Sequence, residues 1–393
     1  MTNQVTRRSF LSLTVASIGI SALKSSTTNA STMFRGNPQH TFYGSGPLSD
    51  KPEIMWKYKM GSFISPVKSK KWSGTGWTGS PVNDEKYVYV GSLDSNFYCL
   101  DRFTGSVKWK FKAHAMFKSS PALYAGRIFT GNVDNHFYCI NAKNGQLLWK
   151  YNSGHDLDSS PAIYNGKVYV GSEAGYMHCF DPVNGNLIWR TFLGGLEGEP
   201  GSCGVESSPA CKNNRVYATN YTGELFCLDS EDGSIIWKAI TGDDTDASCV
   251  VTDNAVITAS EDKYPFVQSF DLKTGKKNWE FGGSSTGGFW SSPAVHENSL
   301  FIGDNRGKLH CLDHRNGKTL WNFKADRAIW SSPAVVDKKV VFGSYDSHLY
   351  FIDAFSGKKI SRIRLHGRVL STPCITDGYI YVGTSEGMFY CLR

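Results

Sequence analysis

Residues 179–189 read CFDPVNGNLIW, and near-copies of this stretch recur along the chain at intervals of about 40 residues. The copies stand at 99–109, 139–149, 227–237, 269–279, 311–321 and, in a decayed form, 351–361. A Ser-Pro, Ser-Ser-Pro or Ser-Thr-Pro landmark precedes each unit, at residues 80, 119, 159, 207, 291, 331 and 371, and a degenerate one stands at 247, where Cys249 replaces the proline. Eight units at such a period predict a radial or solenoid array.

Each unit reads as four short β-strands. In residues 159–189 the runs PAIY, KVYVG, YMHCF and LIWR are rich in β-branched and aromatic residues, and Asn-Gly and Asp-x-x-x-Gly turns separate them. Such runs and turns are typical of an antiparallel meander, and glycine supplies the positive φ that these turns need. Four strands in a repeat of this length predict one propeller blade per unit. A helical repeat is disfavoured because no stretch sustains a 3.6-residue period.

The two ends of the chain complete each other. The eighth unit stops at Arg393 without the strand that carries the tryptophan, whereas residues 54–58, IMWKY, read like the corresponding residues 147–151, LLWKY. An N-terminal strand that completes the last blade closes the ring and leaves no free edge between the first and last blades. We therefore predict an all-β fold, a closed eight-bladed β-propeller of four-stranded blades over residues 54–393.

Residues 1–30 resemble a twin-arginine export signal. Thr6-Arg7-Arg8-Ser9-Phe10-Leu11 precedes a short apolar stretch that ends near Leu23, and Thr28-Asn29-Ala30 offers a cleavage site. A chance Arg-Arg pair is the alternative. The pattern predicts a periplasmic or secreted protein. Residues 31–53 are rich in turn formers, and we expect them to lie across the rim of the ring, with structural roles favoured over functional ones for Arg35 and His40.

Composition excludes several classes of function. The formal net charge is only +7, and the densest basic cluster is 68–71, so nucleic acid is not an expected partner. No segment after residue 30 is apolar enough to cross a membrane, and we expect a monomer. The sequence contains no haem-attachment, zinc, phosphate-loop or hydrolase motif. The expected partner is therefore another protein or a small polar ligand.

The cysteines do not read as a disulfide framework. Six of the ten share one repeated position: Cys99, Cys139, Cys179, Cys227, Cys311 and Cys391. Equivalent positions on neighbouring blades lie beyond the ~7 Å Cα limit for bridging, so these thiols are expected to be buried and free. Cys203 and Cys211 flank an insertion and could pair in an oxidising compartment.

The repeated Asp-x-x-(Thr/Asn)-Gly-x-x-x-Trp, preceded by Ser-Ser-Pro-Ala, resembles the tryptophan-docking repeat of PQQ-like β-propellers over roughly residues 54–393. The resemblance implies a structural role, tying adjacent blades together, for Trp56, Trp109, Trp149, Trp189, Trp237, Trp279 and Trp321. It also implies two branches, namely dehydrogenases that hold pyrroloquinoline quinone and calcium, and non-enzymatic scaffolds. This chain lacks the adjacent cysteines of many such dehydrogenases and the lipid-attachment cysteine of the scaffold lipoprotein.

A candidate site lies where the chain turns into each first strand, three residues before the proline position. This column varies while the residues after it are nearly constant, and it contains Lys118, Asp158, Glu206, Asp246, Trp290 and Trp330. Insertions after Trp56, Trp189 and Trp279 fall on the same face, and the first contains Trp77, which we add to the site. If the first strand is innermost, these residues form a polar funnel with an aromatic wall. Such a funnel could hold a flat, polar or cationic ligand.

Asp158, Glu206 and Asp246 could also coordinate Ca²⁺ through carboxylate oxygens. The alternative is a water-filled channel lined by ordinary solvated charges. The leading hypothesis is an exported binding or scaffold module that acts through the funnel face. The second is a quinoprotein oxidoreductase acting on an alcohol or sugar, in which Trp290 or Trp330 lies under the quinone and one of the acids is the base.

Overall fold

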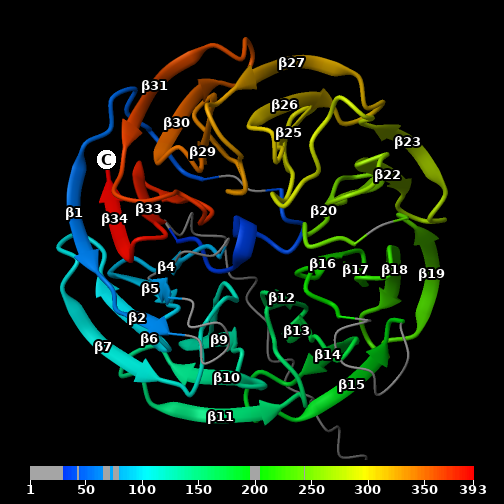
Figure 1. The fold of residues 1–393 in the computed structure, drawn as a ribbon. Helices are drawn as coiled ribbons and strands as arrows, with labels where there is room; N and C mark the ends of the chain where they lie inside the picture. Colours follow the sequence, from blue (N-terminus) through cyan, green and yellow to red (C-terminus); the bar gives the residue numbers. More distant parts are fainter. Residues whose placement is uncertain (1–29, 42–43, 65–70, 74–78, 195–203, 243) are drawn as a thin grey trace, which may run out of the picture.

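The computed structural model describes residues 30–41, 44–64, 71–73, 79–194, 204–242 and 244–393. Eight four-stranded antiparallel sheets stand around a central axis, which confirms the predicted eight-bladed propeller (Figure 1). The first four blades are β4 (Val82–Asn83), β5 (Tyr87–Gly91), β6 (Asn96–Asp101), β7 (Val107–Lys112); β8 (Ala122–Tyr124), β9 (Arg127–Gly131), β10 (His136–Asn141), β11 (Leu147–Asn152); β12 (Ala162–Tyr164), β13 (Lys167–Gly171), β14 (Tyr176–Phe180), β15 (Leu187–Phe192); and β16 (Ala210–Lys212), β17 (Arg215–Thr219), β18 (Glu224–Asp229), β19 (Ile235–Ile240).

The last four blades are β20 (Val250–Val251), β21 (Ala255–Ala259), β22 (Val267–Asp271), β23 (Lys277–Phe281); β24 (Ala294–His296), β25 (Ser299–Gly303), β26 (Lys308–Asp313), β27 (Thr319–Lys324); β28 (Ala334–Val336), β29 (Lys339–Gly343), β30 (His348–Asp353), β31 (Lys359–Arg364); and β32 (Cys374–Thr376), β33 (Tyr379–Gly383), β34 (Met388–Leu392), β1 (Ile54–Lys59). A short hairpin, β2 (Ser62–Ile64) and β3 (Lys71–Ser73), follows β1. The described part of the chain contains no helix with the length and apolar character needed to cross a membrane.

The ring closes as predicted from the chain ends. Strand β1 pairs antiparallel with β34, with Trp56 opposite Cys391, so the eighth blade takes its outer strand from the N-terminal end of the chain. Beyond the strand, Glu53 and Arg393 exchange two backbone hydrogen bonds of 2.8 and 3.0 Å. This pairing joins residues more than 300 positions apart in the chain. Backbone hydrogen bonds between β1 and β34 therefore close the ring.

The tryptophans of the repeat lie against the following blade. Trp109 Nε1 donates to the carbonyl of Ala142 in the next blade at 3.0 Å, and Trp56 makes the equivalent bond to Arg102 across the closing seam. Gly145, with φ of +75°, lies under the Trp109 ring, and a Cβ there would come within 2.6 Å of it. Glycine is therefore needed twice, for the positive φ of the turn and for the approach of the ring.

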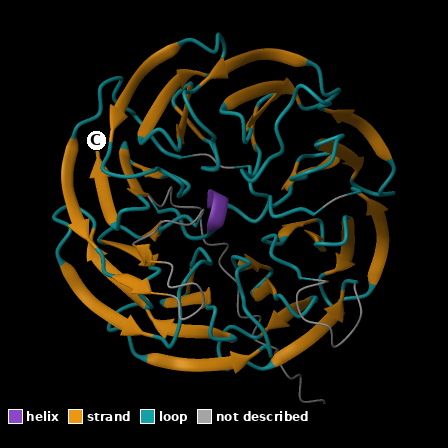
Figure 2. Ribbon diagram, viewed as in Figure 1, coloured by secondary structure: helices purple, strands orange, loops and turns teal. Residues whose placement is uncertain are grey.

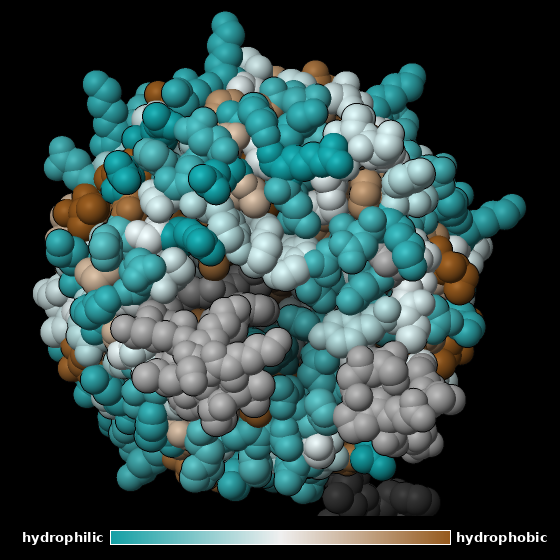
Figure 3. Space-filling model, viewed as in Figure 1, coloured by the Kyte–Doolittle hydropathy of each residue, from teal (hydrophilic) through white to brown (hydrophobic). Residues whose placement is uncertain are grey.

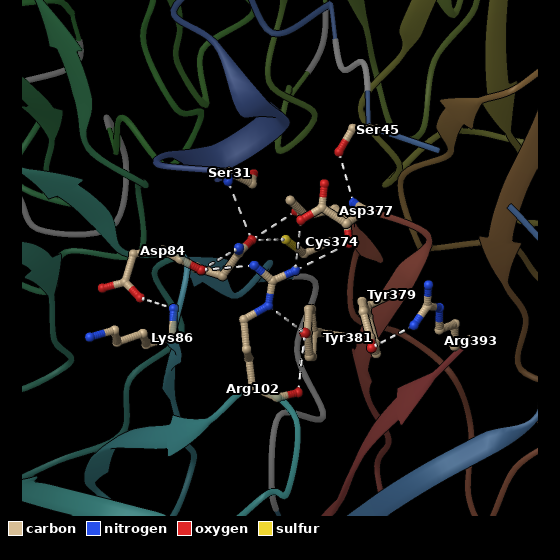
Figure 4. Close-up of polar contacts among 12 residues, drawn as sticks. Ser31, Ser45, Asp84, Lys86, Arg102, Cys374, Asp377, Tyr379, Tyr381 and Arg393 are labelled. Atoms are coloured by element: carbon tan, nitrogen blue, oxygen red, sulfur yellow. Dashed lines mark hydrogen bonds and ion pairs between the residues drawn. The ribbon is translucent and has the colours of Figure 1, made fainter. Parts of the chain in front are cut away.

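The seam between the first and last blades carries a buried arginine, Arg102 (Figure 4). Its guanidinium donates to Tyr381 Oη at 3.1 Å, to the Thr376 carbonyl at 3.4 Å and to Asp377 at 3.3 Å, all in the eighth blade, and to the Asp84 carbonyl in its own blade at 3.1 Å. The side chain is only 2% exposed. The three contacts that cross this blade interface make Arg102 a link between the first and last blades at the point of closure.

Residues 31–41 and 44–48, here called the strap, lie further in than the rim position that we expected. The short 3₁₀ helix η1 (Phe34–Gly36) occupies the centre of the ring (Figures 1 and 2). Backbone bonds join the strap to the innermost strands of seven blades, through residues 83, 123, 211, 251, 295, 335 and 375. The strap thus covers one end of the central channel.

Two strap side chains are buried under the ring and have structural roles. Arg35 donates to the carbonyls of Pro293 and Pro333 at 2.5 and 3.0 Å, and burial lowers its pKa to about 9. His40 Nδ1 lies 3.0 Å from the Cys249 carbonyl, and burial lowers its pKa to about 3, so it is neutral. The two strap side chains therefore bind the backbone carbonyls at the proline position of three blades.

The nine cysteines in the described part are buried free thiols, as expected for the six repeated ones. Burial raises the pKa of Cys139 and of its equivalents to about 12 or above, which leaves them unreactive thiols. Cys211 is among the free ones, and its candidate partner Cys203 lies outside the described residues.

Candidate functional site

The funnel floor is built from the second serine of the Ser-Ser-Pro landmark. Each backbone N–H donates to the serine hydroxyl of the next blade, at 2.7–3.0 Å, in the series Ser80, Ser120, Ser160, Ser208, Ser248, Ser292 and Ser332. This belt of hydroxyls ties the blades together around the axis and accounts for the constancy of the motif. Phe34 of the strap lines the same cavity from below.

The predicted column converges just above this belt. Lys118, Asp158, Glu206, Asp246 and Trp290 line one cavity of about 40 Å³, together with Phe34 and the serines. Trp330 packs on Trp290 with ring centroids 3.8 Å apart and ring planes at 31°. Residues spread over more than 200 positions therefore meet because each occupies the same place in its blade. The remaining candidate, Trp77, lies outside the described residues. The face seen in Figure 3 is mainly hydrophilic and is hollowed near its centre.

The carboxylates fall into two groups, and the three that we proposed as calcium ligands are divided between them. Oxygens of Asp158, Glu173 and Glu206 lie within 4.8 Å of one another, and so do those of Asp244, Asp246 and Glu261. Glu206 and Asp246 still interact electrostatically. Each group has enough oxygen donors to attract a hard cation, but the trio Asp158, Glu206 and Asp246 is not a single cluster.

Glu173 and Tyr221 belong to the site but were missed by the column analysis. Both stand at the turn between the second and third strands of their blades, and their N–H groups donate to the carbonyls of Asp156 and Gly204, two residues before the column, at 2.9 and 3.1 Å. Glu261 occupies the same turn position in blade five. The turn between the second and third strands recurs in every repeat, so its variable position is the sequence signal that points to these additional candidates.

A tyrosine hydroxyl bridges the first carboxylate group. Tyr221 Oη lies 2.5 Å from Glu206 Oε2 and 3.1 Å from Glu173 Oε1. One phenolic proton cannot fully satisfy two charged carboxylates, so holding a proton on one of them is favourable. Burial, followed by repulsion from Glu206, raises the pKa of Glu173 to about 8. Burial and Asp158 raise the pKa of Glu206 to about 7.

Burial and neighbouring charges also shift the pKa values of Asp246 and Lys118. Burial and the nearby Glu206 raise the pKa of Asp246 to about 9. Lys118 forms an ion pair with Asp158 Oδ2, and although burial alone would lower the Lys118 pKa, Asp158 and Glu206 raise it. One half of the funnel therefore has more carboxyl groups than the charge of Lys118 can neutralise. These carboxyl groups hold protons where no other cation is bound.

The other half of the funnel is aromatic. Behind Trp290, the Trp330 ring meets the Tyr345 ring edge-on at 4.6 Å, and the Arg368 guanidinium lies 5.0 Å from the Tyr345 centroid. Two buried polar atoms of the cavity lining lack a hydrogen-bond partner within the described part of the molecule, namely Asp158 Oδ1 and Trp290 Nε1. Buried polar groups are almost always paired, so these two atoms indicate where a bound molecule would be held.

The ring of eight four-stranded blades defines the class of eight-bladed β-propellers. The chain belongs to the family whose model is described as outer membrane protein assembly factor BamB, which matches residues 51–281, 266–360 and 310–392. A search among curated proteins found no match.

Solved structures share the fold at low sequence identity. The quinohemoprotein alcohol dehydrogenase of Comamonas testosteroni is 14% identical with a TM-score of 0.78, over 93% of this chain and 80% of that one. A europium-containing methanol dehydrogenase is 14% identical with a TM-score of 0.75, over 93% and 98% of the two chains. BamB from Moraxella catarrhalis is 15% identical with a TM-score of 0.67, over 86% and 100%. These likenesses concern the fold alone.

Proposed function

We propose that this protein is an exported, non-enzymatic binding module that takes its ligand or partner in the axial funnel. The observation that carries the proposal is the division of one cavity into an acidic side and an aromatic side, each with a buried polar atom that has no hydrogen-bond partner among the described residues. The Trp290–Trp330 pair, with ring centroids 3.8 Å apart, offers a ligand an aromatic surface, and buried polar atoms without a partner among the described residues call for water or a ligand. The strap closes the opposite end, so the funnel is a cup with one entrance.

Export is part of the proposal. The twin-arginine pattern within residues 1–30 supports it, although those residues lie outside the described part of the chain. The description of the matching family as an outer membrane assembly factor is in keeping with a location beyond the inner membrane. A scaffold role toward another protein is compatible with the same funnel face, since a protein loop that carries a basic side chain could enter the cup.

The second candidate is a quinoprotein oxidoreductase, and the flat surface of the Trp290–Trp330 pair favours it because a planar quinone could stack there. The other lining residues do not fit pyrroloquinoline quinone. That molecule is tricyclic and carries several carboxylates, whereas the described lining is acidic and its cavity is about 40 Å³. The only basic group of this lining, Lys118, is paired with Asp158. Calcium alone would suit the carboxylate groups, but without the quinone it supplies no redox chemistry.

A reconstitution experiment tests the proposal. The purified protein is titrated with pyrroloquinoline quinone and Ca²⁺, absorbance is recorded, and the mixture is assayed with an alcohol and an artificial electron-accepting dye. We expect neither a bound-quinone spectrum nor dye reduction. Stoichiometric quinone binding with alcohol-dependent dye reduction would replace the binding-module proposal by the oxidoreductase.

A further inference from the structure

The funnel already contains one bound ammonium group, because the Lys118 side chain provides it. Its Nζ contacts Asp158 Oδ2 and feels the carboxylates of Glu206 and Glu173. The Asp158 side chain is 4% exposed, so this pair is removed from solvent. The protein thus demonstrates that an alkylammonium is accommodated at this end of the cavity. Among the described residues, one lysine faces the carboxyl groups of Asp158, Glu173, Glu206 and Asp246, and the raised pKa values of the last three show that protons take the place of a second cation.

The unpaired atom of Asp158 shows which kind of group is missing. Oδ2 accepts from Lys118, while Oδ1 is buried, lines the cavity and has no partner among the described residues. A carboxylate oxygen only accepts hydrogen bonds, so the missing group is a donor. The cavity volume of about 40 Å³ is large enough for a water molecule or for an ammonium head.

The body of a ligand would lie on the aromatic side. Asp246 and Trp290 are neighbours in the column and line the same cavity, so a cation held by the acids has the Trp290 ring beside it. Indole rings attract both stacked aromatic rings and cations. Trp290 Nε1 is buried and has no partner in the described part of the chain, which calls for a hydrogen-bond acceptor on the ligand.

We infer that the funnel binds an organic cation, namely a primary ammonium group on a planar body that carries an oxygen or nitrogen acceptor. This inference rests on the proposed function. The ammonium enters the acidic cavity and donates to Asp158 Oδ1 and to Glu206, with the Asp246 group beside it. The planar body stacks on Trp290, and the acceptor lies within reach of Trp290 Nε1. Free amines and lysine-like side chains of a partner share this chemistry.

Three probes of nearly the same shape separate charge from shape. Tyramine carries an ammonium, 4-ethylphenol is neutral and 4-hydroxyphenylacetate is anionic, and all three present the same phenol ring. Binding to the mature chain is measured by isothermal titration calorimetry at pH 8. A charged hydrogen bond is worth enough to change affinity roughly tenfold to a hundredfold. We expect tyramine to bind at least about tenfold more tightly than 4-ethylphenol, and 4-hydroxyphenylacetate not to bind.

Four variants examine the residues. Glu206→Gln and Asp246→Asn should each weaken tyramine at least about tenfold, and Trp290→Leu should weaken tyramine and 4-ethylphenol alike. Lys118→Met removes the internal ammonium, so tyramine should bind more tightly than to the unmodified protein. Glu231→Gln, on a side chain that is 64% exposed in an outer turn, is the matched control and should change nothing. Thermal unfolding of each variant verifies that it is folded.

The outcomes are distinguishable. Preference for tyramine, lost in the acid variants and increased by Lys118→Met, supports the inference. Equal binding of all three probes, insensitive to the acid variants but lost in Trp290→Leu, overturns the cation inference and leaves the funnel a binding site. Absence of tyramine binding to folded protein, both unmodified and Lys118→Met, also overturns the inference. Quinone binding with dye reduction in the reconstitution experiment overturns the proposed function itself.

Discussion

Replacing Arg102 by methionine should weaken the ring at its seam. Methionine keeps much of the apolar stem but removes the guanidinium donors that join the first blade to the eighth (Figure 4). The loss includes a bond of 3.1 Å to Tyr381 Oη and one of 3.4 Å to the Thr376 carbonyl, both buried, and the contact with Asp377 at 3.3 Å. Because Arg102 is 2% exposed, water does not replace these donors without opening the interface.

The magnitude follows from these contacts. A hydrogen bond from a charged donor contributes about 1.5–3 kcal/mol, and two such inter-blade bonds are lost. Asp377 is 30% exposed, so its ion pair is screened and adds at most about 1 kcal/mol. We expect the free energy of unfolding to fall by about 4 kcal/mol. Urea unfolding followed by tryptophan fluorescence measures it, provided that the transition remains two-state, and size-exclusion chromatography shows whether the ring opens to larger species.

Arg315→Met is the matched control. Arg315 also follows the repeated aspartate, but it pairs with Asp313 in its own turn at 2.6 Å and is 59% exposed. Solvent screens an exposed pair of this kind, so its loss should change stability little. The reasoning is refuted if Arg102→Met costs as little as Arg315→Met, since the seam would then depend on β1 and Trp56 alone.

Three further predictions concern closure, thiols and pH. Deleting residues 31–60 removes the strap and β1 and exposes a sheet edge, so we expect aggregation; a soluble monomer with an unchanged melting temperature would contradict the closed ring. Denatured, unreduced protein should show at least six reactive thiols with Ellman's reagent, whereas four or five disulfides by mass spectrometry would contradict the buried-thiol interpretation. The pKa values of Glu173, Glu206 and Asp246 are raised to about 8, 7 and 9 in the folded protein. Between about pH 4 and 9 the folded protein therefore holds protons that the unfolded chain has already lost. Stability should therefore fall as pH rises through this window, by up to about 1.4 kcal/mol per pH unit and group. Replacing Asp158, Glu206 and Asp246 by Asn, Gln and Asn should flatten this fall and leave the fold intact, and a pH-independent melting temperature in the unmodified protein would contradict it.

Much of the fold could be predicted because its causes are local and repeated. The turn glycines, exemplified by Gly145, need a positive φ wherever they occur, and the strand runs have a period of two, so one unit predicts the others. The missing strand after Arg393 and the extra one around Trp56 together predicted closure, and the pairing of β1 with β34 confirms it. The convergence of Lys118, Asp158 and Trp290 followed from the same register.

Other features depend on contacts between blades, which no single unit encodes. The sequence by itself determined the blade, the number of blades, the closing strand and the variable column, because each depends on local turn geometry and on the repeat. Only the tertiary structure decided that Glu173 and Tyr221 join Glu206 in one hydrogen-bonded group, that Arg102 spans the seam and that Phe34 forms the floor of the funnel. The physical reason is that these features depend on contacts between residues far apart in the chain. The raised carboxyl pKa values, the burial of the Arg102 guanidinium and the covered channel arise only when the closed ring brings such residues together.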